Sequence, residues 1–382
     1  MTAKVSESTN GVRAINAISV IAAIAVVCTL QYRRHVEYRM RQKYTPQAHV
    51  ALQAPEAQWP WPQASEDRPH PGVRHWVDKS SKSGTILDLF EFDFNVNPQL
   101  RFEMYDQDED DDKPFGNEVK YWDNGVGVIA KRLNTKNDGP VVAAWNGLFF
   151  DLDGAGQGRT AHHLTPIVLH GKLHYPDLPT YRWTFGVKYH SGRPKFDVLF
   201  KPKPAEMEAL FDHAAGAAQC VIKDGKELKL EPFPNKPGYV PPAHEETPDE
   251  AGYIRMIDHV RVSRTSIGWN RDSSKLYLLY VTAPDAKTEA ALSKNGLNSV
   301  NGGWTLADIQ RFWKAKGVYC AINSDGGGPA QLVYRRPDSR YCLLPAVWNG
   351  SNARIVLNEQ LTDAPPGGAL MYFYITEAPV TR

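Results

Sequence analysis

Hydrophobic and polar side chains follow the two-residue period of β-strands through much of the chain after residue 85. In residues 90–96, phenylalanine and valine alternate with acidic and amide side chains, which predicts a half-buried strand. A short apolar run at 141–145, followed by Asn-Gly, predicts a strand that ends in a turn, and the continuous apolar run at 276–281 predicts a buried strand. Further short strands are expected at residues 166–169, 183–189, 196–200, 219–223 and 318–322. Strands therefore outnumber helices in the predicted domain.

A helical pattern appears near the carboxyl end, over residues 305–317. Thr305 is a suitable N-cap, and Asp308 stands three residues on, where it can complete a capping box. Four apolar side chains follow at helical spacing, and Gly317 is placed to end the helix: Leu306, Ile309, Phe312 and Trp313. Because hairpins dominate and helices are few, the expected fold is α+β. It comprises a single β-rich, mixed-sheet domain with a few helices, preceded by one transmembrane helix.

The amino terminus carries the strongest membrane signal in the sequence. Residues 14–32 contain no charged side chain, and as a helix they would span about 28 Å, close to the thickness of a bilayer's hydrocarbon core. Arg13 precedes this segment and five basic residues follow it by residue 43. A single uncleaved anchor is expected, with a signal peptide cleaved after the small residues at 23–25 as the alternative.

These features divide the chain into four parts. An N-terminal tail covers residues 1–13, and the anchor covers residues 14–32. A basic and then proline-rich stalk is expected at residues 33–75, because this stretch lacks amphipathic periodicity. The folded domain is expected at residues 76–382. The basic flank after the anchor favours a cytoplasmic domain, although this tendency is weak for a long translocated domain.

Charge and composition exclude several classes of protein. The chain has 44 Lys and Arg against 43 Asp and Glu, so its net charge of +1 gives no basic surface for general nucleic-acid binding. Four cysteines in 382 residues are too few for a disulfide scaffold or a cysteine-rich zinc module. Cys320 and Cys342 could pair in an oxidising compartment or remain buried thiols.

No metal site is assigned from the sequence. The acidic run at 106–112 lacks the glycine turn of a calcium loop and is interpreted as a solvated loop. Four histidines lie between residues 162 and 174, but their spacing does not match a zinc motif: His162, His163, His170 and His174. A divalent cation remains conceivable as a cofactor, although none is required.

Three segments could carry chemistry. The first is the loop of Asp325, Gly326, Gly327 and Gly328, where glycine amides can approach an anion closely after a buried strand. Asn323 lies two residues before this loop. The second is Arg264 with Thr265, a guanidinium beside a hydroxyl that suits a phosphodiester. The third comprises Asn146 and Asp151, which flank an apolar stretch. Each segment alone is also compatible with a turn or a surface role.

The order of these segments resembles the phosphodiester glycosidase domain family. The family pattern has an Asn-Gly-Gly-Phe-Phe block, an Arg-Thr-x-Ile-Gly block and an Asn-x-Asp-Gly-Gly-Gly-Ser block. Here residues 146–150 read Asn-Gly-Leu-Phe-Phe, residues 264–268 read Arg-Thr-Ser-Ile-Gly, and residues 323–329 read Asn-Ser-Asp-Gly-Gly-Gly-Pro. The resemblance covers about residues 84–382.

The resemblance implies a glycosidase that hydrolyses a sugar 1-phosphodiester, in a glycan or cell-surface polymer, on the sugar side. Asp325 is the first candidate for the base or transition-state stabiliser, and Asp151 the second. Arg264, Thr265 and the amides of residues 326–328 would bind the phosphate, and Asn146 and Asn323 complete the expected substrate-binding set. The partners implied are the glycan substrate and, through the anchor, a membrane.

Departures from the family pattern keep other functions open. Ser324 stands where the family usually has an apolar residue, and Ala330 and Gln331 replace a hydroxyl-rich continuation. Leu148 replaces a glycine of the first block, and Pro329 stands where a serine commonly follows the glycines, which removes one N–H and one hydroxyl. The alternatives are a metal-dependent phosphodiesterase that cuts the P–O bond with Asp151 and Asp325, and a non-catalytic glycan-binding domain. The family's exported members favour a single-pass membrane protein with an extracytoplasmic domain, periplasmic or at the cell surface.

Overall fold

A computed structural model describes most of the chain after residue 53. The described residues are 54–116, 119–120, 125–136, 139–152, 160–228, 230, 261–294, 302–324, 326, 330–361 and 368–378, with residues 119–120, 151–152, 160 and 293–294 described in backbone only. The predicted tail at 1–13, the anchor at 14–32 and the first part of the stalk lie outside these residues. Within the described residues, no helix has the length and apolar character needed to cross a bilayer.

The segment Gln53–Arg382 forms one compact unit built on three sheets. The long sheet has 13 strands, nine of them in the order β1-β2-β3-β16-β15-β17-β13-β11-β12. Their bounds are β1 Ser65–His70, β2 Val73–Asp78, β3 Ile86–Asp93, β16 Lys275–Pro284, β15 Arg264–Trp269, β17 Cys320–Asn323, β13 His213–Lys223, β11 Trp183–His190 and β12 Arg193–Phe200. Four further strands join it at the sides: β9 Ile167–Leu169, β10 Lys172–His174, β14 Lys226–Glu227 and β20 Val347–Trp348.

The second sheet has six strands in the order β21-β19-β18-β6-β22-β4. Their bounds are β21 Ile355–Val356, β19 Tyr341–Leu344, β18 Leu332–Arg335, β6 Val141–Asn146, β22 Met371–Glu377 and β4 Leu100–Asp106. A small third sheet contains β5 Val119–Lys120, β8 Thr160–His163 and β7 Phe150–Leu152. The described helices are η1 Gln107–Asp110, α2 Val126–Lys136, α3 Pro204–Leu210, α5 Ala286–Lys294 and α6 Leu306–Lys316.

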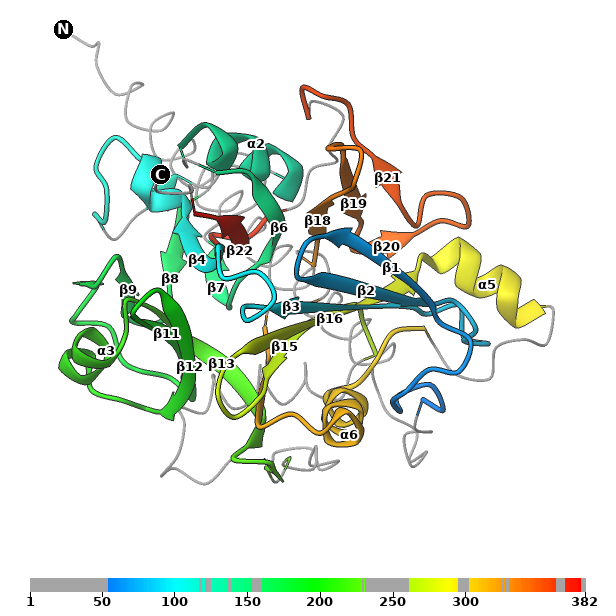
Figure 1. The fold of residues 1–382 in the computed structure, drawn as a ribbon, viewed down its shortest axis with the longest axis horizontal. Helices are drawn as coiled ribbons and strands as arrows, with labels where there is room; N and C mark the ends of the chain where they lie inside the picture. The colour runs from blue at the N-terminus through cyan, green and yellow to red at the C-terminus, as the bar shows by residue number, and fades with distance from the viewer. Residues whose placement is uncertain are drawn as a thin grey trace, which may run out of the picture. The chain divides into compact units, whose positions relative to one another are not determined.

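The two large sheets pack face to face, and a helix covers the outer face of each (Figure 1). The main core lies between the sheets and includes Phe92 and Ile267 of the long sheet with Trp145 and Phe373 of the six-stranded sheet. α6 packs on the outer face of the long sheet, and α2 on the outer face of the six-stranded sheet. The fold class is therefore α+β and mostly β-sheet, as predicted.

The predicted helix at the carboxyl end is confirmed together with its caps. The Thr305 hydroxyl accepts from Asp308 N, while the Asp308 side chain accepts from the backbone of Thr305, so the capping box is complete. Gly317 ends α6 in the left-handed conformation with φ 75°. Both ends of the helix could be predicted from the sequence, because helix capping involves only a few neighbouring residues.

The strand predicted around residues 90–96 differs in its extent and its burial. β3 covers Ile86–Asp93, and seven of its eight residues are buried, because α6 covers one face and the six-stranded sheet the other. Val96 lies beyond the strand and is exposed. Each buried acidic side chain of the strand has a basic partner. Glu91 Oε1 lies 3.0 Å from Lys275 Nζ, and Asp88 Oδ1 lies 2.7 Å from His75 Nε2. The alternation of apolar and acidic side chains in this strand therefore did not indicate a face exposed to solvent.

The predicted stalk is wrong for residues 54–75. β1 pairs with β2 at the edge of the long sheet, where proline does not interrupt a central hydrogen-bond ladder. Ahead of β1, the Trp61 ring stacks on Phe312 of α6 at 5.3 Å between centroids. Ala57 is fully buried in the same cluster. Residues 54–75 therefore belong to the folded domain, because their aromatic side chains are buried against α6. The amino-acid composition of the segment does not reveal this burial.

Cys320 and Cys342, together with Cys220, are buried free thiols. Cys320 and Cys342 therefore do not form the disulfide that was one of the two alternatives.

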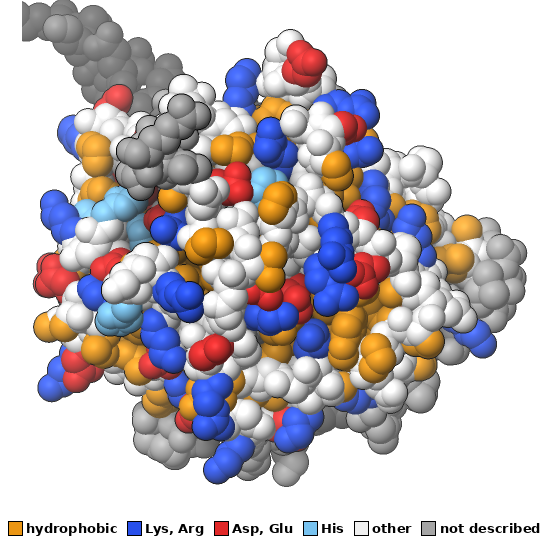
Figure 2. Space-filling model, viewed as in Figure 1, with side chains coloured by type: hydrophobic (Ala, Val, Ile, Leu, Met, Phe, Trp, Pro, Cys, Tyr) orange, Lys and Arg blue, Asp and Glu red, His pale blue; other side chains and the backbone are white. Residues whose placement is uncertain are grey.

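The surface charge is mixed. On the face drawn in Figure 2, Lys and Arg side chains are interspersed with Asp and Glu.

A buried His–Asp pair links β2 to β3 and the segment before β21. His75 presents Nδ1 to Asp67 at 3.1 Å and Nε2 to Asp88 at 2.7 Å, while its ring stacks on Phe90 at 4.0 Å. Arg354 also pairs with Asp88. Burial opposes the charged imidazolium, but the hydrogen bonds and charges of the two carboxylates outweigh it and raise the pKa of His75. Arg354 and His75 likewise outweigh burial and lower the pKa of Asp88.

The raised pKa of His75 predicts a specific dependence of stability on pH. In the unfolded chain His75 titrates near pH ~6.5, so its contribution is fully present below that pH and is lost as pH rises through its higher folded pKa. We expect the free energy of unfolding to fall over this range, and to fall less in Asp67→Asn, which removes one carboxylate that raises the pKa of His75. Urea denaturation between pH 6 and pH 9 measures this difference. Asp338→Asn, an exposed carboxylate elsewhere, serves as control, and equal slopes in wild type and Asp67→Asn would contradict the prediction.

Candidate functional site

The ends of β6, β15 and β17 bring three of the predicted segments together. Asn146, the last residue of β6, accepts a hydrogen bond at Oδ1 from the Thr265 hydroxyl at 2.9 Å. The same oxygen accepts from Gln331 N at 3.4 Å, and Asn146 N donates to Gln331 O at 3.4 Å. All three side chains are buried. A polar bridge therefore joins the two large sheets at the point where the glycine loop returns to β18.

The loop is held at its start as well as at its end. Ser324 follows β17, and both its backbone N and its hydroxyl donate to Thr265 O, each at 2.9 Å. Thr265 thus contacts the beginning of the loop through its carbonyl and the end of the loop through Asn146. The loop's two ends are anchored on β15 before any ligand binds.

Gly326 lies close against Ser263 and Arg264, where β15 begins. A Cβ added to Gly326 would lie 2.9 Å from Ser263 O and 3.6 Å from Arg264 Cδ. No side chain fits that position without a shift of backbone. The loop can therefore approach Arg264 closely only because residue 326 is glycine.

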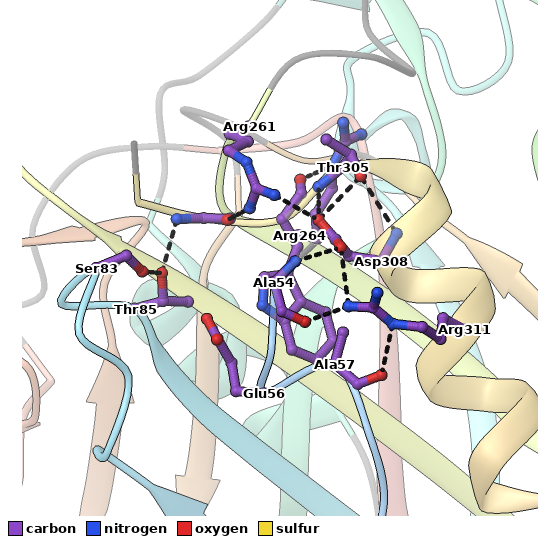
Figure 3. A network of polar contacts seen from close by, with 12 residues as sticks. Ala54, Glu56, Ala57, Ser83, Thr85, Arg261, Arg264, Thr305, Asp308 and Arg311 are labelled. Carbon is purple, nitrogen blue, oxygen red and sulfur yellow. Dashed lines mark hydrogen bonds and ion pairs between the residues drawn. The ribbon is translucent and has the colours of Figure 1, made fainter. Parts of the chain in front are cut away.

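Arg264 is a fully buried guanidinium at the start of β15. It is 0% exposed, and its Nε donates to Trp304 O at 3.1 Å. Figure 3 shows Arg264 beside Thr305 and Asp308 at the N-terminal end of α6. A buried positive charge beside a glycine loop is a strong attraction for an anion, because the surrounding protein screens charge less than water does.

Asn323 ends β17 with a buried acceptor that no described residue satisfies. Its Nδ2 donates to Gln219 Oε1 at 2.6 Å and to Ser324 O at 2.8 Å. Its Oδ1 is buried and has no hydrogen-bond partner among the described residues. A free buried acceptor at the base of the loop can take a hydroxyl or amide donor from a ligand.

The predicted residues approach the loop from both faces of the long sheet. Thr265 lies on the same face as Ile267, toward the core between the sheets, and meets Asn146 there. Arg264 pairs with Val281, and Asn323 with Ser266, on the face covered by α6. Side chains on opposite faces can act on one ligand only at the strand ends, which is where the loop begins.

Four of the predicted site residues are not described in full. Asp325, Gly327 and Gly328 lie outside the described residues. Asp151 lies in β7 opposite His162, and only its backbone is described. The structure thus assembles Asn146, Arg264, Thr265, Asn323 and Gly326 around one loop, without describing the two candidate catalytic carboxylates.

Sequence reasoning missed a buried acidic cluster next to the small sheet. The interpretation of residues 106–112 as a solvated loop is wrong for Asp106 and Asp108, which are fully buried. His163 Nε2 of β8 lies 3.0 Å from Asp106 Oδ2, and the Tyr175 hydroxyl donates to Asp108 Oδ2. Burial, together with the charge of Asp106, raises the pKa of Asp108 to about 6.

A local signal could have found this cluster. Asp106 caps η1, and Glu109 completes a capping box with it, the same pattern that marked α6. Burial also raises the pKa of Glu109 to about 7. Because Phe150 of β7 lies opposite His163, these groups are close to the strand that carries Asp151.

A separate open cleft of about 630 Å³ lies along β1, β2 and the turn after β18. Its lining includes Arg68, Arg74, Arg335 and Arg336 with the carboxylates of Glu91 and Asp93. None of the predicted site residues that the structure describes with a side chain lines it, nor does Gly326. We therefore place the candidate site at the glycine loop and not in this cleft.

Comparison with known proteins agrees with the blocks around the loop. The model of the phosphodiester glycosidase family matches residues 139–364, more than half of the chain. None of the curated proteins compared with the chain matches it.

Three solved structures resemble the chain at low sequence identity. The catalytic domain of zebrafish N-acetylglucosamine-1-phosphodiester alpha-N-acetylglucosaminidase, auto-inhibited by its pro-peptide, is 17% identical with a TM-score of 0.49; the match covers 82% of this chain and 88% of that one. A hypothetical protein from Synechocystis is 10% identical with a TM-score of 0.45, over 83% of this chain and 64% of that one. An exported protein from Burkholderia pseudomallei K96243 is 10% identical with a TM-score of 0.38, over 77% and 74%.

The family match spans the Asn146, Arg264 and glycine-loop blocks, and the fold brings these blocks together at one loop. This chain belongs to the phosphodiester glycosidase family.

Proposed function

We propose that this protein is a hydrolase that cleaves a sugar 1-phosphodiester at the bond between the anomeric carbon and the phosphate oxygen. The observation that carries the proposal is the close approach of Gly326 to the buried Arg264 within the family's matched region. The N–H groups of the glycine loop, together with this guanidinium, would suit the single negative charge of a phosphodiester.

Arg264 and the amides of residues 326–328 would bind the phosphate. As the bond to the anomeric carbon breaks, negative charge grows on this phosphate, so groups already oriented toward it stabilise the transition state more than the ground state. Asn323 Oδ1, which has no hydrogen-bond partner within the described part of the chain, would accept from a sugar hydroxyl or amide.

Asn146 and Thr265 receive a different role from the one expected from the sequence. Their side chains bond to each other, and the Thr265 carbonyl holds Ser324. We assign them to positioning the loop rather than to direct contact with phosphate or sugar.

The reaction is a hydrolysis in which water supplies the new bond to the anomeric carbon. The C–O bond to phosphate breaks, and the products are a free sugar and a phosphate monoester. Asp325 would accept the proton of the attacking water or stabilise the developing positive charge on the sugar, with Asp151 as the second candidate. A phosphate is already a good leaving group, so little acid assistance is needed.

Hydrolysis in ¹⁸O-labelled water tests the proposal directly. The full chain is incubated with a panel of sugar 1-phosphodiesters, and the products are analysed by mass spectrometry. We expect label in the free sugar. Label in the phosphate would instead show P–O cleavage, and loss of that activity with a chelator would favour a metal-dependent phosphodiesterase. Saturable glycan binding without turnover by the folded protein would favour a binding domain.

Gly326→Ala is expected to reduce kcat/KM by about 10²-fold. The added Cβ would meet Ser263 O at 2.9 Å and displace the loop from Arg264, and a misplacement of about 1 Å can cost this much. Gly225→Ala controls for general destabilisation: a φ of 74° strains alanine in this exposed hairpin turn, but no atom lies near the added Cβ, so kcat/KM should stay at the wild-type value. Initial rates on the best substrate of the panel measure the effect, and unchanged kcat/KM in Gly326→Ala would exclude a close role for the loop.

The anchor at residues 14–32 and the extracytoplasmic location of the domain remain predictions from the sequence. We propose a single-pass membrane protein on that basis alone. Fractionation of cells and protease accessibility of the intact protein would test both points.

A further inference from the structure

A cluster of two histidines and one glutamate lies outside the candidate site. Glu103 is on β4 of the six-stranded sheet, His213 begins β13 of the long sheet, and His170 lies in the turn between β9 and β10. Each side chain offers one ligand atom, and the three atoms lie within 4.8 Å of one another. The sequence did not assign His170 to a metal site, because the spacing of the histidines at 162–174 matches no zinc motif. Glu103 and His213 are distant from it along the chain.

The backbone around the cluster is held in place. β9 pairs with β13, so the β9–β10 turn is beside the start of β13, and Gly171 N donates to Asp212 O at 2.7 Å. His170 and Gly171 both have positive φ, 52° and 74°, as a two-residue hairpin turn requires. Asn is the usual residue at the first of these positions, and histidine here places an imidazole at the turn next to His213, with ring centroids 4.8 Å apart.

His213 has a nitrogen that the described protein does not satisfy. The side chain is 4% exposed, and Nε2 lies 2.7 Å from Glu103 Oε2. Nδ1 is buried and has no hydrogen-bond partner among the described residues. A buried polar nitrogen without a partner commonly marks a bound ion or water.

We propose that Glu103, His170 and His213 bind one divalent transition-metal ion, with Zn²⁺ as the best match. Two imidazoles and one carboxylate are ligands that zinc favours, whereas magnesium and calcium prefer all-oxygen sets. In a tetrahedral zinc site the ligand atoms are about 3.3 Å apart, as follows from bonds of about 2.0–2.1 Å. The ligand atoms now lie within 4.8 Å of one another, so the exposed His170 would move toward Glu103 and His213 by about 1–2 Å when the ion binds.

The site is distinct from the glycine loop. His213 is six residues from Gln219, the partner of Asn323, which corresponds to about 20 Å along a strand. An ion at this site would instead link the six-stranded sheet to β13 and the β9–β10 hairpin. Its expected effect is on thermal stability, because a ligand that binds only the folded state stabilises that state.

Zinc binding by the untagged full chain tests the proposal. After removal of metals with a chelator, we expect one equivalent of Zn²⁺ to bind in calorimetry and to raise Tm. Co²⁺ should bind at the same place and give the visible absorption of a tetrahedral or five-coordinate ion. X-ray absorption of the zinc form should show two imidazoles.

His170→Asn and Glu103→Gln are the decisive variants, since His213 is buried and its replacement could unfold the protein. Asn suits the turn at residue 170 and removes only the imidazole. Each variant should lower zinc affinity at least 10-fold and abolish the rise in Tm. His190→Asn, an exposed histidine on β11, is the matched control and should bind zinc as wild type does. Absence of stoichiometric zinc binding, or equal binding by His170→Asn and wild type, would overturn the proposal.

Discussion

Asp325→Asn is expected to abolish detectable turnover of the sugar phosphodiester while leaving the fold intact. Asn has nearly the same shape as Asp but cannot accept a proton from water or stabilise positive charge on the sugar. General-base catalysis alone contributes about 10²- to 10⁴-fold, so kcat should fall by at least that range. Ser324 N remains hydrogen-bonded to Thr265 O, which keeps the loop's start anchored in the variant.

The measurement is kcat for wild type, Asp325→Asn and Asp151→Asn on the same substrate, with thermal unfolding as a check on folding. Asp338→Asn, an exposed carboxylate paired with Arg340, is the matched control and should keep wild-type kcat. Wild-type turnover by Asp325→Asn would remove Asp325 from the mechanism. A large loss in Asp151→Asn only would transfer the role to Asp151.

Asp308→Ala should lower the free energy of unfolding by about 3–5 kcal/mol, which is typical when one partner of a buried ion-pair network is removed. Asp308 is 2% exposed and accepts from Ala54 N at 2.9 Å and from the Thr305 hydroxyl at 2.9 Å. It also pairs with Arg261 at 3.2 Å and Arg311 at 3.3 Å. The network is shown in Figure 3, and one carboxylate joins its two cations to the first turn of α6.

Part of this loss of stability should come from weaker packing of the segment that precedes β1. Arg311 donates to Ala57 O at 3.1 Å and to Ala54 O, so Asp308 orients the guanidinium that holds this segment. Urea denaturation of wild type and Asp308→Ala measures the effect. Asp338→Ala breaks an exposed pair and should cost less than about 1 kcal/mol. A loss in Asp308→Ala no larger than in this control would show that the network contributes little.

Local patterns in the sequence were sufficient for several elements. The capping residues Thr305, Asp308 and Gly317 act within a few residues of one another, so they predicted the start and end of α6. The apolar run at 276–281 predicted part of β16, since burial on both faces leaves a continuous hydrophobic stretch. The spacing of the three blocks indicated the family before any contact was known.

Burial of charged side chains could not be predicted in this way. Asp88, Asp106 and Asp108 look like solvated carboxylates in the sequence, because their partners are separate segments of the chain. His75, His163 and Tyr175 satisfy or surround them only after the strands pair. The same reason explains the proline-rich segment at 54–75, where contact with Phe312 of α6 overrides composition.

For the site, the sequence by itself determined which residue types are present and in which order: a glycine loop, an arginine beside a threonine, and an asparagine after a buried strand. Only the tertiary structure decided that Arg264 is buried against Gly326, that Thr265 and Asn146 bond to each other, and that Glu103 meets His170 and His213. Each of these contacts joins segments that are far apart in the chain. Their distances depend on how the sheets pair and pack, which no short window of sequence contains.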